Sequence, residues 1–195
     1  LWRRLDQTRT LSYVRNEWEG RGGWMDTGSV TLSMQRHEQE RDRMKTSDGV
    51  ASGGDISGFD LDDWGLTARF QNGMWAYGAE AHRETVDSFK DKTDADGNVT
   101  SSSVGSPIAD GAKVVTSAAY VQYEWDVVPG FQVIPGLRFT KVSAEADTVN
   151  VGGTLTAMPE HHWDTLVGSL RGLWGRGAGT SWYAGLSQGF RTPSL

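Results

Sequence analysis

Three side chains that could do acid-base or metal chemistry, Glu80, His82 and Glu84, recur at a spacing of two residues. In an extended strand this spacing places all three on one face. Imidazole and carboxylate groups can hold a metal ion or line the path of a polar ligand. A metal site needs three or four converging ligands and only these three are visible, so we favour hydration of a polar channel and predict no bound metal.

A calcium site is a second candidate, because Asp94-Ala-Asp-Gly-Asn98 resembles the beginning of a calcium-binding loop. The sixth position of such a loop must be glycine and the twelfth must be acidic. Here these positions hold Val99 and Gly105. The segment therefore predicts a polar turn without calcium.

Catalytic arrangements are weakly supported. The sequence has no Gly-x-Ser-x-Gly nucleophile motif. Glu80 and Glu124 could act as a glycosidase pair, but sequence gives no separation between them. His161 and His162, beside Trp163, fall in a segment that we expect to be a long external loop, where a solvated role is favoured over coordination of iron or haem. We predict no catalytic residues and no cofactor.

Composition excludes further classes of protein. The 195 residues include 19 Lys and Arg against 25 Asp and Glu, with a net charge of −6 and no basic cluster, so nucleic-acid binding is not expected. The absence of cysteine removes disulfides and thiolate chemistry. No run approaches the roughly 20 apolar residues of a membrane helix.

Polar and apolar residues alternate with a period of two around these side chains, which predicts antiparallel β-structure throughout. We expect eight strands, at about residues 9–18, 29–44, 62–71, 74–86, 114–125, 131–142, 163–174 and 181–190. The charged run Arg36–Arg43 is expected to continue its strand into solvent. Short connections at 19–28, 72–73, 126–130 and 175–180 alternate with long ones at 45–61, 87–113 and 143–162. An outer-membrane barrel has this alternation, because its turns are short on one side and its loops long on the other.

The two faces of these strands differ in polarity. One face carries no charge in the six clearest strands: Trp64, Leu66, Ala68, Phe70; Trp75, Tyr77, Ala79, Ala81; Ala119, Val121, Tyr123, Trp125; Phe131, Val133, Pro135, Leu137, Phe139; Leu166, Gly168, Leu170, Gly172, Trp174; Trp182, Ala184, Leu186. The other face carries the candidates for the lumen: Arg69, Glu80, His82, Glu124, Arg138 and Arg171. Three arginines near the middle of a membrane would cost roughly 6 to 12 kcal/mol on the lipid side. We therefore expect the polar face to line a wet interior.

Aromatic placement separates a membrane barrel from a soluble sandwich. Aromatic residues of the apolar face flank every clear short turn: Phe70 and Trp75, Trp125 and Phe131, Trp174 and Trp182. A membrane interface selects such a belt, whereas a sandwich places its large aromatics over the core centre. One residue breaks the pattern, because Pro135 removes a ladder hydrogen bond inside a strand. We expect a bulge or a local break there.

The C-terminal residues Ser187-Gln-Gly-Phe-Arg-Thr-Pro-Ser-Leu195 resemble the Gly-Phe-Arg-Ala-Pro box of TonB-dependent outer-membrane receptors. The matching positions are Gly189, Phe190, Arg191, Thr192, Pro193, Ser194 and Leu195, with Thr192 where alanine is commoner. Tyr77–Arg83, Ala119–Trp125 and Pro135–Phe139 are similar to further barrel segments in the same order. Residues 1–59 fit only by pattern.

The resemblance implies that residues 1–195 are part of a barrel domain, with about eight of some 22 strands and a plug domain that is absent from this chain. It further implies a bacterial outer-membrane receptor for energised uptake of an iron-siderophore complex, haem or cobalamin. Its partners would be the lipid bilayer, a small metal chelate and the TonB complex, reached through the plug. Arg191 would either contact plug carboxylates or form an ion pair at the rim. The alternative is a self-contained small outer-membrane barrel, an adhesin or enzyme without TonB coupling.

The face assignment predicts that Leu170→Arg destabilises the folded protein in lipid far more than Arg171→Leu does. The expected gap is about 2 kcal/mol or more, the cost of arginine on the lipid face near the midplane. Refolding titrations in bilayers of fixed composition measure both variants. Equal effects, or the reverse order, would refute the orientation of the strands.

Overall fold

The chain is described here by a computed structural model covering residues 2–20, 23–47, 49–104, 108–151, 154–175 and 179–191. The elements of this part are all β-strands: β1 (Trp2–Glu19), β2 (Thr27–Ser47), β3 (Val50–Asn72), β4 (Trp75–Thr93), β5 (Val99–Ser103), β6 (Ala112–Tyr123), β7 (Trp125–Val128), β8 (Phe131–Val151), β9 (Thr154–Trp174) and β10 (Trp182–Ser187). A search of these residues for a helix long and apolar enough to cross a membrane finds none.

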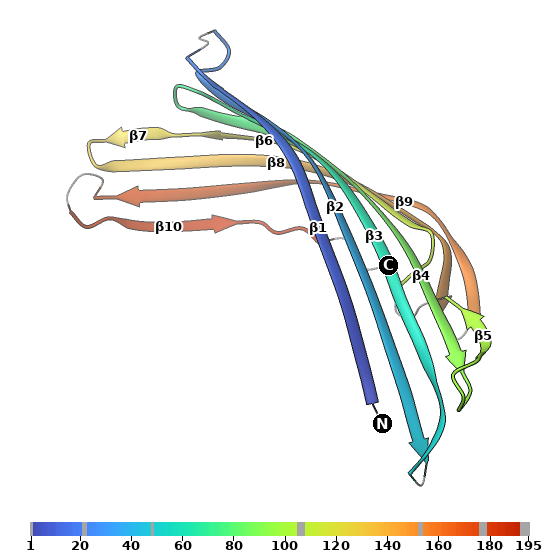
Figure 1. Cartoon of the computed structure of the whole chain (residues 1–195). Helices are drawn as coiled ribbons and strands as arrows, with labels where there is room; N and C mark the ends of the chain where they lie inside the picture. The colour runs from blue at the N-terminus through green and yellow to red at the C-terminus, as the bar shows by residue number, and fades with distance from the viewer. Residues whose placement is uncertain are drawn as a thin grey trace.

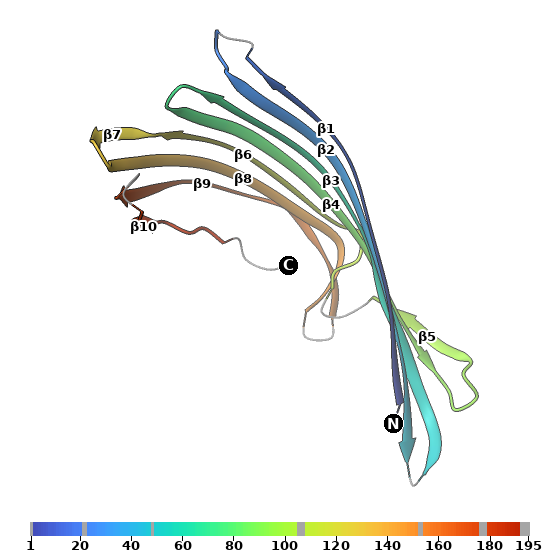
Figure 2. The same cartoon turned by 60° about the vertical axis from the view of Figure 1, so that its left-hand side comes forward.

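The strands form one antiparallel sheet in the order β1-β2-β3-β4-β6-β8-β9-β10, with β5 paired to β4 and β7 to β8. This path of eight strands follows the chain from one edge to the other. Figures 1 and 2 show long strands side by side in a strongly curved sheet, with β1 and β10 at its two edges. Within the described strands these edges do not pair with each other, so the sheet is open. The prediction of an all-β, antiparallel architecture is confirmed.

Pro135 of β8 lies opposite a gap that divides β6 from β7. The register of pairing with β8 is the same on both sides of this gap. Gln122 of β6 pairs with Gly136, and Trp125 of β7 pairs with Val133, so the same register continues on both sides of the gap. Pro135 has no backbone N–H to donate to the ladder, which accounts for the gap beside it. On its other side Pro135 pairs with Leu170 in regular register. The expected local break is present, and the alternative of a bulge at this position is wrong.

The strands run far beyond the predicted ends. The sequence predicts loops at 45–61 and 143–162. In the structure β2 ends only at Ser47 and β3 begins at Val50, and β8 ends only at Val151 and β9 begins at Thr154. Much of 87–113 is also strand, in β4 and β5. The error has a physical cause: alternation vanishes where both faces are solvated, although backbone pairing persists. The expectation that Arg36–Arg43 continues a strand is met by β2.

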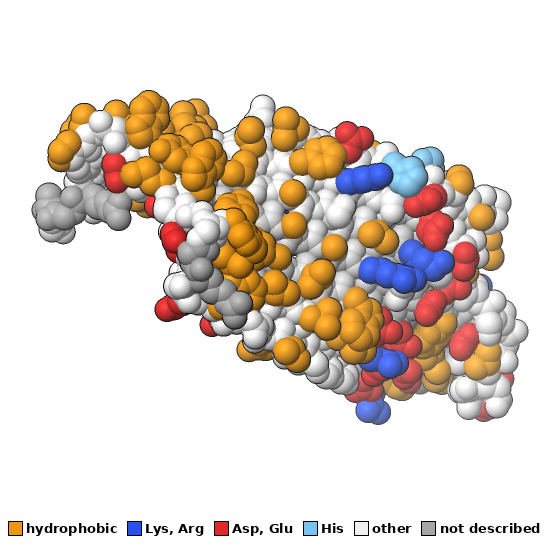
Figure 3. All heavy atoms as spheres, turned by 90° about the horizontal axis from the view of Figure 1, so that it is seen from above, with side chains coloured by type: hydrophobic (Ala, Val, Ile, Leu, Met, Phe, Trp, Pro, Cys, Tyr) orange, Lys and Arg blue, Asp and Glu red, His pale blue; other side chains and the backbone are white. Residues whose placement is uncertain are grey.

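The sheet has two open faces and only a small buried cluster of Ala109, Ala112 and Ala146 among the described residues. A single layer cannot enclose large side chains, and no side chain in the described residues is both large and fully buried. Apolar side chains stay open instead: Leu137, Leu166 and Leu170 are 53%, 63% and 52% exposed. In Figure 3 hydrophobic side chains gather over the end with the short turns, and charged ones over the end with the long strand extensions. Such a broad exposed apolar surface fits contact with lipid.

Aromatic rings gather at the short turns. The rings of Trp75 and Tyr123 lie 4.7 Å apart between centroids, and those of Phe131 and Trp174 lie 5.3 Å apart. Trp182 pairs with Trp174 across β9 and β10. The turn before Trp75 uses Gly73 at a φ of 54°, a conformation that glycine adopts without strain.

This belt predicts a common depth for four tryptophans. Trp75, Trp125, Trp174 and Trp182 all flank short turns on the apolar face, so each should lie near one membrane interface. Fluorescence quenching by lipids brominated at different acyl positions, in proteins that each keep one of the four, measures the depth. Depths scattered across the hydrocarbon core would overturn the belt.

Candidate functional site

The polar face of the sheet is hollowed where β3, β4, β6, β8, β9 and the end of β10 come together. The hollow has a volume of about 540 Å³. Its lining is mostly polar or small: Arg69, Ala76, Glu80, Tyr120, Gln122, Gly136, Leu137, Arg138, Val167, Gly168, Ser169, Ser187 and Gln188. Strand alternation explains this set. Successive residues of a strand point to opposite faces of the sheet, and most of these side chains belong to the polar face.

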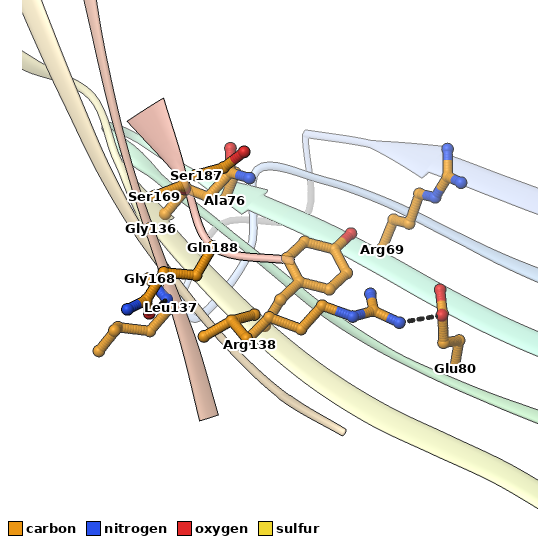
Figure 4. Close-up of a pocket in the computed structure, with 13 residues that line it drawn as sticks. Arg69, Ala76, Glu80, Gly136, Leu137, Arg138, Gly168, Ser169, Ser187 and Gln188 are labelled. Atoms are coloured by element: carbon orange, nitrogen blue, oxygen red, sulfur yellow. Dashed lines mark hydrogen bonds and ion pairs between the residues drawn. The ribbon is translucent and has the colours of Figure 1, made fainter. Parts of the chain in front are cut away.

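An ion pair crosses the hollow between β8 and β4. The Arg138 guanidinium donates from Nη2 to Oε1 of Glu80, and Figure 4 shows the two side chains reaching toward each other. Arg138 Nε also donates to Thr140 Oγ1 at 3.2 Å. Both charged side chains are partly exposed, so water shares in their solvation and the pair contributes little to stability. The pair gives the hollow a charged wall that is partly open to solvent.

Neighbouring side chains lie close over two glycines of this wall. A Cβ added to Gly78 would come within 2.7 Å of the Tyr120 hydroxyl, and one added to Gly136 within 2.7 Å of Ser169 Oγ. A Cβ at Gly78 would also meet the backbone oxygen of Ala68, which cannot turn aside as a side chain can, so close approach rather than backbone conformation requires glycine there. Beside the hollow, Arg171 donates from Nη2 to Gln122 Oε1 at 2.7 Å.

Three of the six lumen candidates line the hollow together: Arg69, Glu80 and Arg138. Arg171 contacts it through Gln122. The two others lie elsewhere. His82 Nδ1 is 3.3 Å from Asp63 Oδ1, on the stretch of β4 that leads toward the long hairpins. Glu124 lies at the gap between β6 and β7, where its backbone N–H donates to Met74 O at 2.8 Å.

The remaining chemical candidates are not brought together. Glu80 is in the hollow and Glu124 is not, so no glycosidase pair forms there. His161 and His162 lie on β9 and not in a loop, which corrects the sequence prediction. His162 Nε2 is 3.7 Å from Glu160 Oε2, and both are exposed. Over the described ranges no three or more His, Asp or Glu side chains are grouped to hold a metal ion.

Asp94 has a local structural role. Its Oδ1 accepts hydrogen bonds from the backbone N–H groups of Asp96 and Asn98, at 3.0 and 2.8 Å. The hydrogen bond from Asn98 is the main reason that the pKa of Asp94 is lowered. The side chain therefore organises the exposed turn between β4 and β5, as an Asx-turn does.

The C-terminal motif begins where the sheet ends. β10 stops at Ser187, so the alternation that would direct Arg191 inward does not reach it. Gln188 closes the strand with two bonds to Gly168: its N–H donates to Gly168 O, and its Oε1 accepts from Gly168 N, both at 3.0 Å. Gly189, Phe190 and Arg191 follow without strand structure, and Thr192 to Leu195 lie outside the described residues.

Sequence reasoning missed Gln122, Asp63 and Gln188. The first two share the face of Arg69 by alternation, so the available signal was their parity, but neither was chosen among the candidates. Gln188 gives no periodic signal, because it acts through two bonds to one backbone residue after its strand has ended.

Known structures share this fold. The chain matches the structure titled "Copper transporter OprC" with a TM-score of 0.71 and 17% identity, over 97% of this chain and 32% of that one. The structure titled "Crystal structure of the siderophore receptor PiuA from Acinetobacter baumannii" matches with a TM-score of 0.47 and 17% identity, over 87% of this chain and 30% of that one. The chain thus spans about a third of the length of OprC.

A search of curated proteins finds no match. A family model described as "TonB dependent receptor-like, beta-barrel" matches residues 2–195, nearly the whole chain. Proteins of this family reside in the bacterial outer membrane, in agreement with the apolar face of the sheet. The chain therefore belongs to the TonB-dependent receptor family, as part of the β-barrel of a bacterial outer-membrane protein.

Proposed function

We propose that the chain forms part of the barrel wall of a receptor that takes up a scarce nutrient, such as an iron-siderophore complex, haem or cobalamin, with energy from TonB. The observation that carries the proposal is the segregation of the faces. Leu166 and Leu170 stay exposed on one side, while Arg138, Glu80 and Arg69 line a polar hollow on the other. A wall with this pattern separates lipid from a wet passage.

In this proposal the polar face lines the lumen and solvates the passage. Arg138 and Glu80 neutralise each other, whereas Arg69 forms no hydrogen bond or ion pair within the part of the chain that the structure describes. Arg69 is exposed and lines both this hollow and a second one beside it. An unpaired cation on a lumen wall is suited to meet a carboxylate of a plug domain. Plug movement, and not chemistry at these residues, would open the passage.

The rest of the protein completes the barrel in this proposal. The edges β1 and β10 carry backbone groups that must be paired in hydrocarbon, at several kcal/mol for each group left unpaired. Further strands, to a total of about 22, would pair with them, and a plug outside residues 1–195 would fill the lumen. A self-contained eight-stranded barrel would need β1 to pair with β10, which the described strands do not do. No residue of the chain is assigned a catalytic step.

Uptake in cells tests the proposal. Cells that express the full-length protein as the sole receptor of this family, and otherwise identical cells without TonB, are given radiolabelled iron complexed by catecholate, hydroxamate or citrate ligands, then labelled haem and cobalamin. We expect accumulation of at least one of these only when both receptor and TonB are present, with surface binding retained without TonB. The proposal fails if the receptor increases uptake of none, or if the uptake is the same without TonB.

A further inference from the structure

Two arginines are held by one buried carboxylate on the polar face, in the strand extensions of β2 and β3. Asp55 is only 3% exposed, and Arg43 donates to its Oδ1 from Nε at 2.7 Å and also from Nη2. Arg41 Nη2 lies 3.4 Å from Asp55 Oδ2 and donates to Ser57 Oγ at 2.9 Å. Burial alone would raise the pKa of Asp55, but the hydrogen bond and charge of Arg43, with the charges of Lys90 and Arg41, hold it below its ordinary value.

Positive charge exceeds negative charge around Asp55. Residues paired across neighbouring strands share a face. Asp55 pairs with Arg43 and Lys92, and Arg43 pairs with a further arginine of β1. In the next row of this face, Arg41 and Lys90 both pair with Ser57. The cations that surround the single carboxylate are therefore Arg3, Arg41, Arg43, Lys90 and Lys92.

The opposite face of the same extensions is acidic. Its carboxylates are Glu38, Glu40, Asp42, Asp60, Asp62, Asp87 and Asp91. Arg36 on this face is already paired with Glu38 at 2.7 Å. The whole chain has a net charge of −6, so the excess of cations on one face is a local arrangement and not a result of composition.

The five cations around Asp55 form a basic cluster, and this basic cluster lies beyond the membrane. Phe70 belongs to the aromatic belt, and from it to Asp55 the strand β3 runs uninterrupted for about 50 Å, at roughly 3.3 Å per residue. The apolar band of an outer-membrane barrel is only about 25 Å tall, and tilt shortens the strand's height by about a quarter. Asp55 therefore lies above the interface opposite the belt, where long strand extensions surround the mouth of a barrel.

We propose that Arg41, Arg43 and Lys90 form an anion-binding site at the external mouth, which receives multiply charged carboxylate or phosphate oxygens of a metal chelate. The assignment of the ligand as cargo rests on the proposed function; the site itself does not. Guanidinium groups bind carboxylate and phosphate oxygens with paired, charge-assisted hydrogen bonds. The Arg41 and Arg43 side chains are 30% and 35% exposed, so an anion from solvent can reach both guanidinium groups although Asp55 itself is buried.

Asp55 acts as a positioning residue. It fixes two long side chains that would otherwise lose conformational entropy when an anion binds. One carboxylate cannot neutralise both arginines and the neighbouring lysines, so the site remains cationic. Its inward face separates it from lipid phosphate groups, which lie outside the barrel.

Protection of a reporter cysteine tests the site. Ser101 is exposed, pairs with Lys92 on the same face, and makes no side-chain hydrogen bond to the residues that the structure describes. The full-length receptor with Ser101→Cys, in nanodiscs without lipopolysaccharide, is treated with an anionic and a cationic thiol reagent. Citrate or pyrophosphate is added and compared with chloride at equal ionic strength, and purified lipopolysaccharide is added alone in a separate sample. We expect faster reaction with the anionic reagent and saturable protection by either added anion.

Matched variants locate the effect. Arg41→Gln with Arg43→Gln should weaken protection about tenfold or more, since hydrogen bonds to charged groups contribute roughly 1.5 to 3 kcal/mol each. Glu40→Gln with Asp42→Asn changes neighbouring charges on the opposite face and should leave protection intact. Asp55→Asn should leave the preference for the anionic reagent and weaken saturable protection. Protection no greater than with chloride, equal loss in both double variants, or protection by lipopolysaccharide alone would overturn the proposal. Uptake plays no part in this readout, so it distinguishes failure of the site from failure of the receptor proposal.

Discussion

Hydrocarbon offers a backbone amide no hydrogen-bond partner, so each N–H and C=O that crosses a membrane must be satisfied by the protein itself. In this chain the antiparallel ladders from β1 through β10 meet that requirement. Once the backbone is paired in a sheet, side chains alternate between two faces. The apolar face, the aromatic belt and the hydrated hollow all follow from this one constraint. Pro135 shows its limit, since a single missing donor divides β6 from β7 while the register continues.

The difference between the two faces of the sheet changes along the length of the strands. Between the belt and the outer interface, Leu137 and Leu170 keep one face apolar while Arg138 and Glu80 pair on the other. In the strand extensions neither face needs to be apolar, and charge replaces hydrophobicity as the difference between them. Asp55 is the most deeply buried carboxylate among the described residues, and it lies in this charged region. On this polar face an apolar row of Leu61, Val86 and Ala112 separates the charged region around Asp55 from the hollow.

The sequence predicted the strands best where lipid restricts the choice of residue. Trp75, Trp125 and Trp174 marked the short turns, and the alternation around Arg138 marked the faces. It failed at the long ends, because residues such as His161 and His162 lie on a strand with solvent on both sides and so carry no periodic signal. The pair Arg138–Glu80 was also beyond prediction, since it depends on the register of β4, β6 and β8 together.

Alternating exposure to lipid and water along β8 is the central claim, and single-cysteine labelling tests it most directly. The chain has no cysteine of its own, so each introduced thiol reports without background from residues 1–195. Cysteines at Leu137, Arg138, Phe139 and Thr140 of the full-length receptor are labelled in native membranes with a lipid-soluble and a water-soluble maleimide. We predict that positions 137 and 139 react with the lipid-soluble reagent and positions 138 and 140 with the water-soluble one. Uniform labelling by one reagent, or the opposite alternation, would contradict the account.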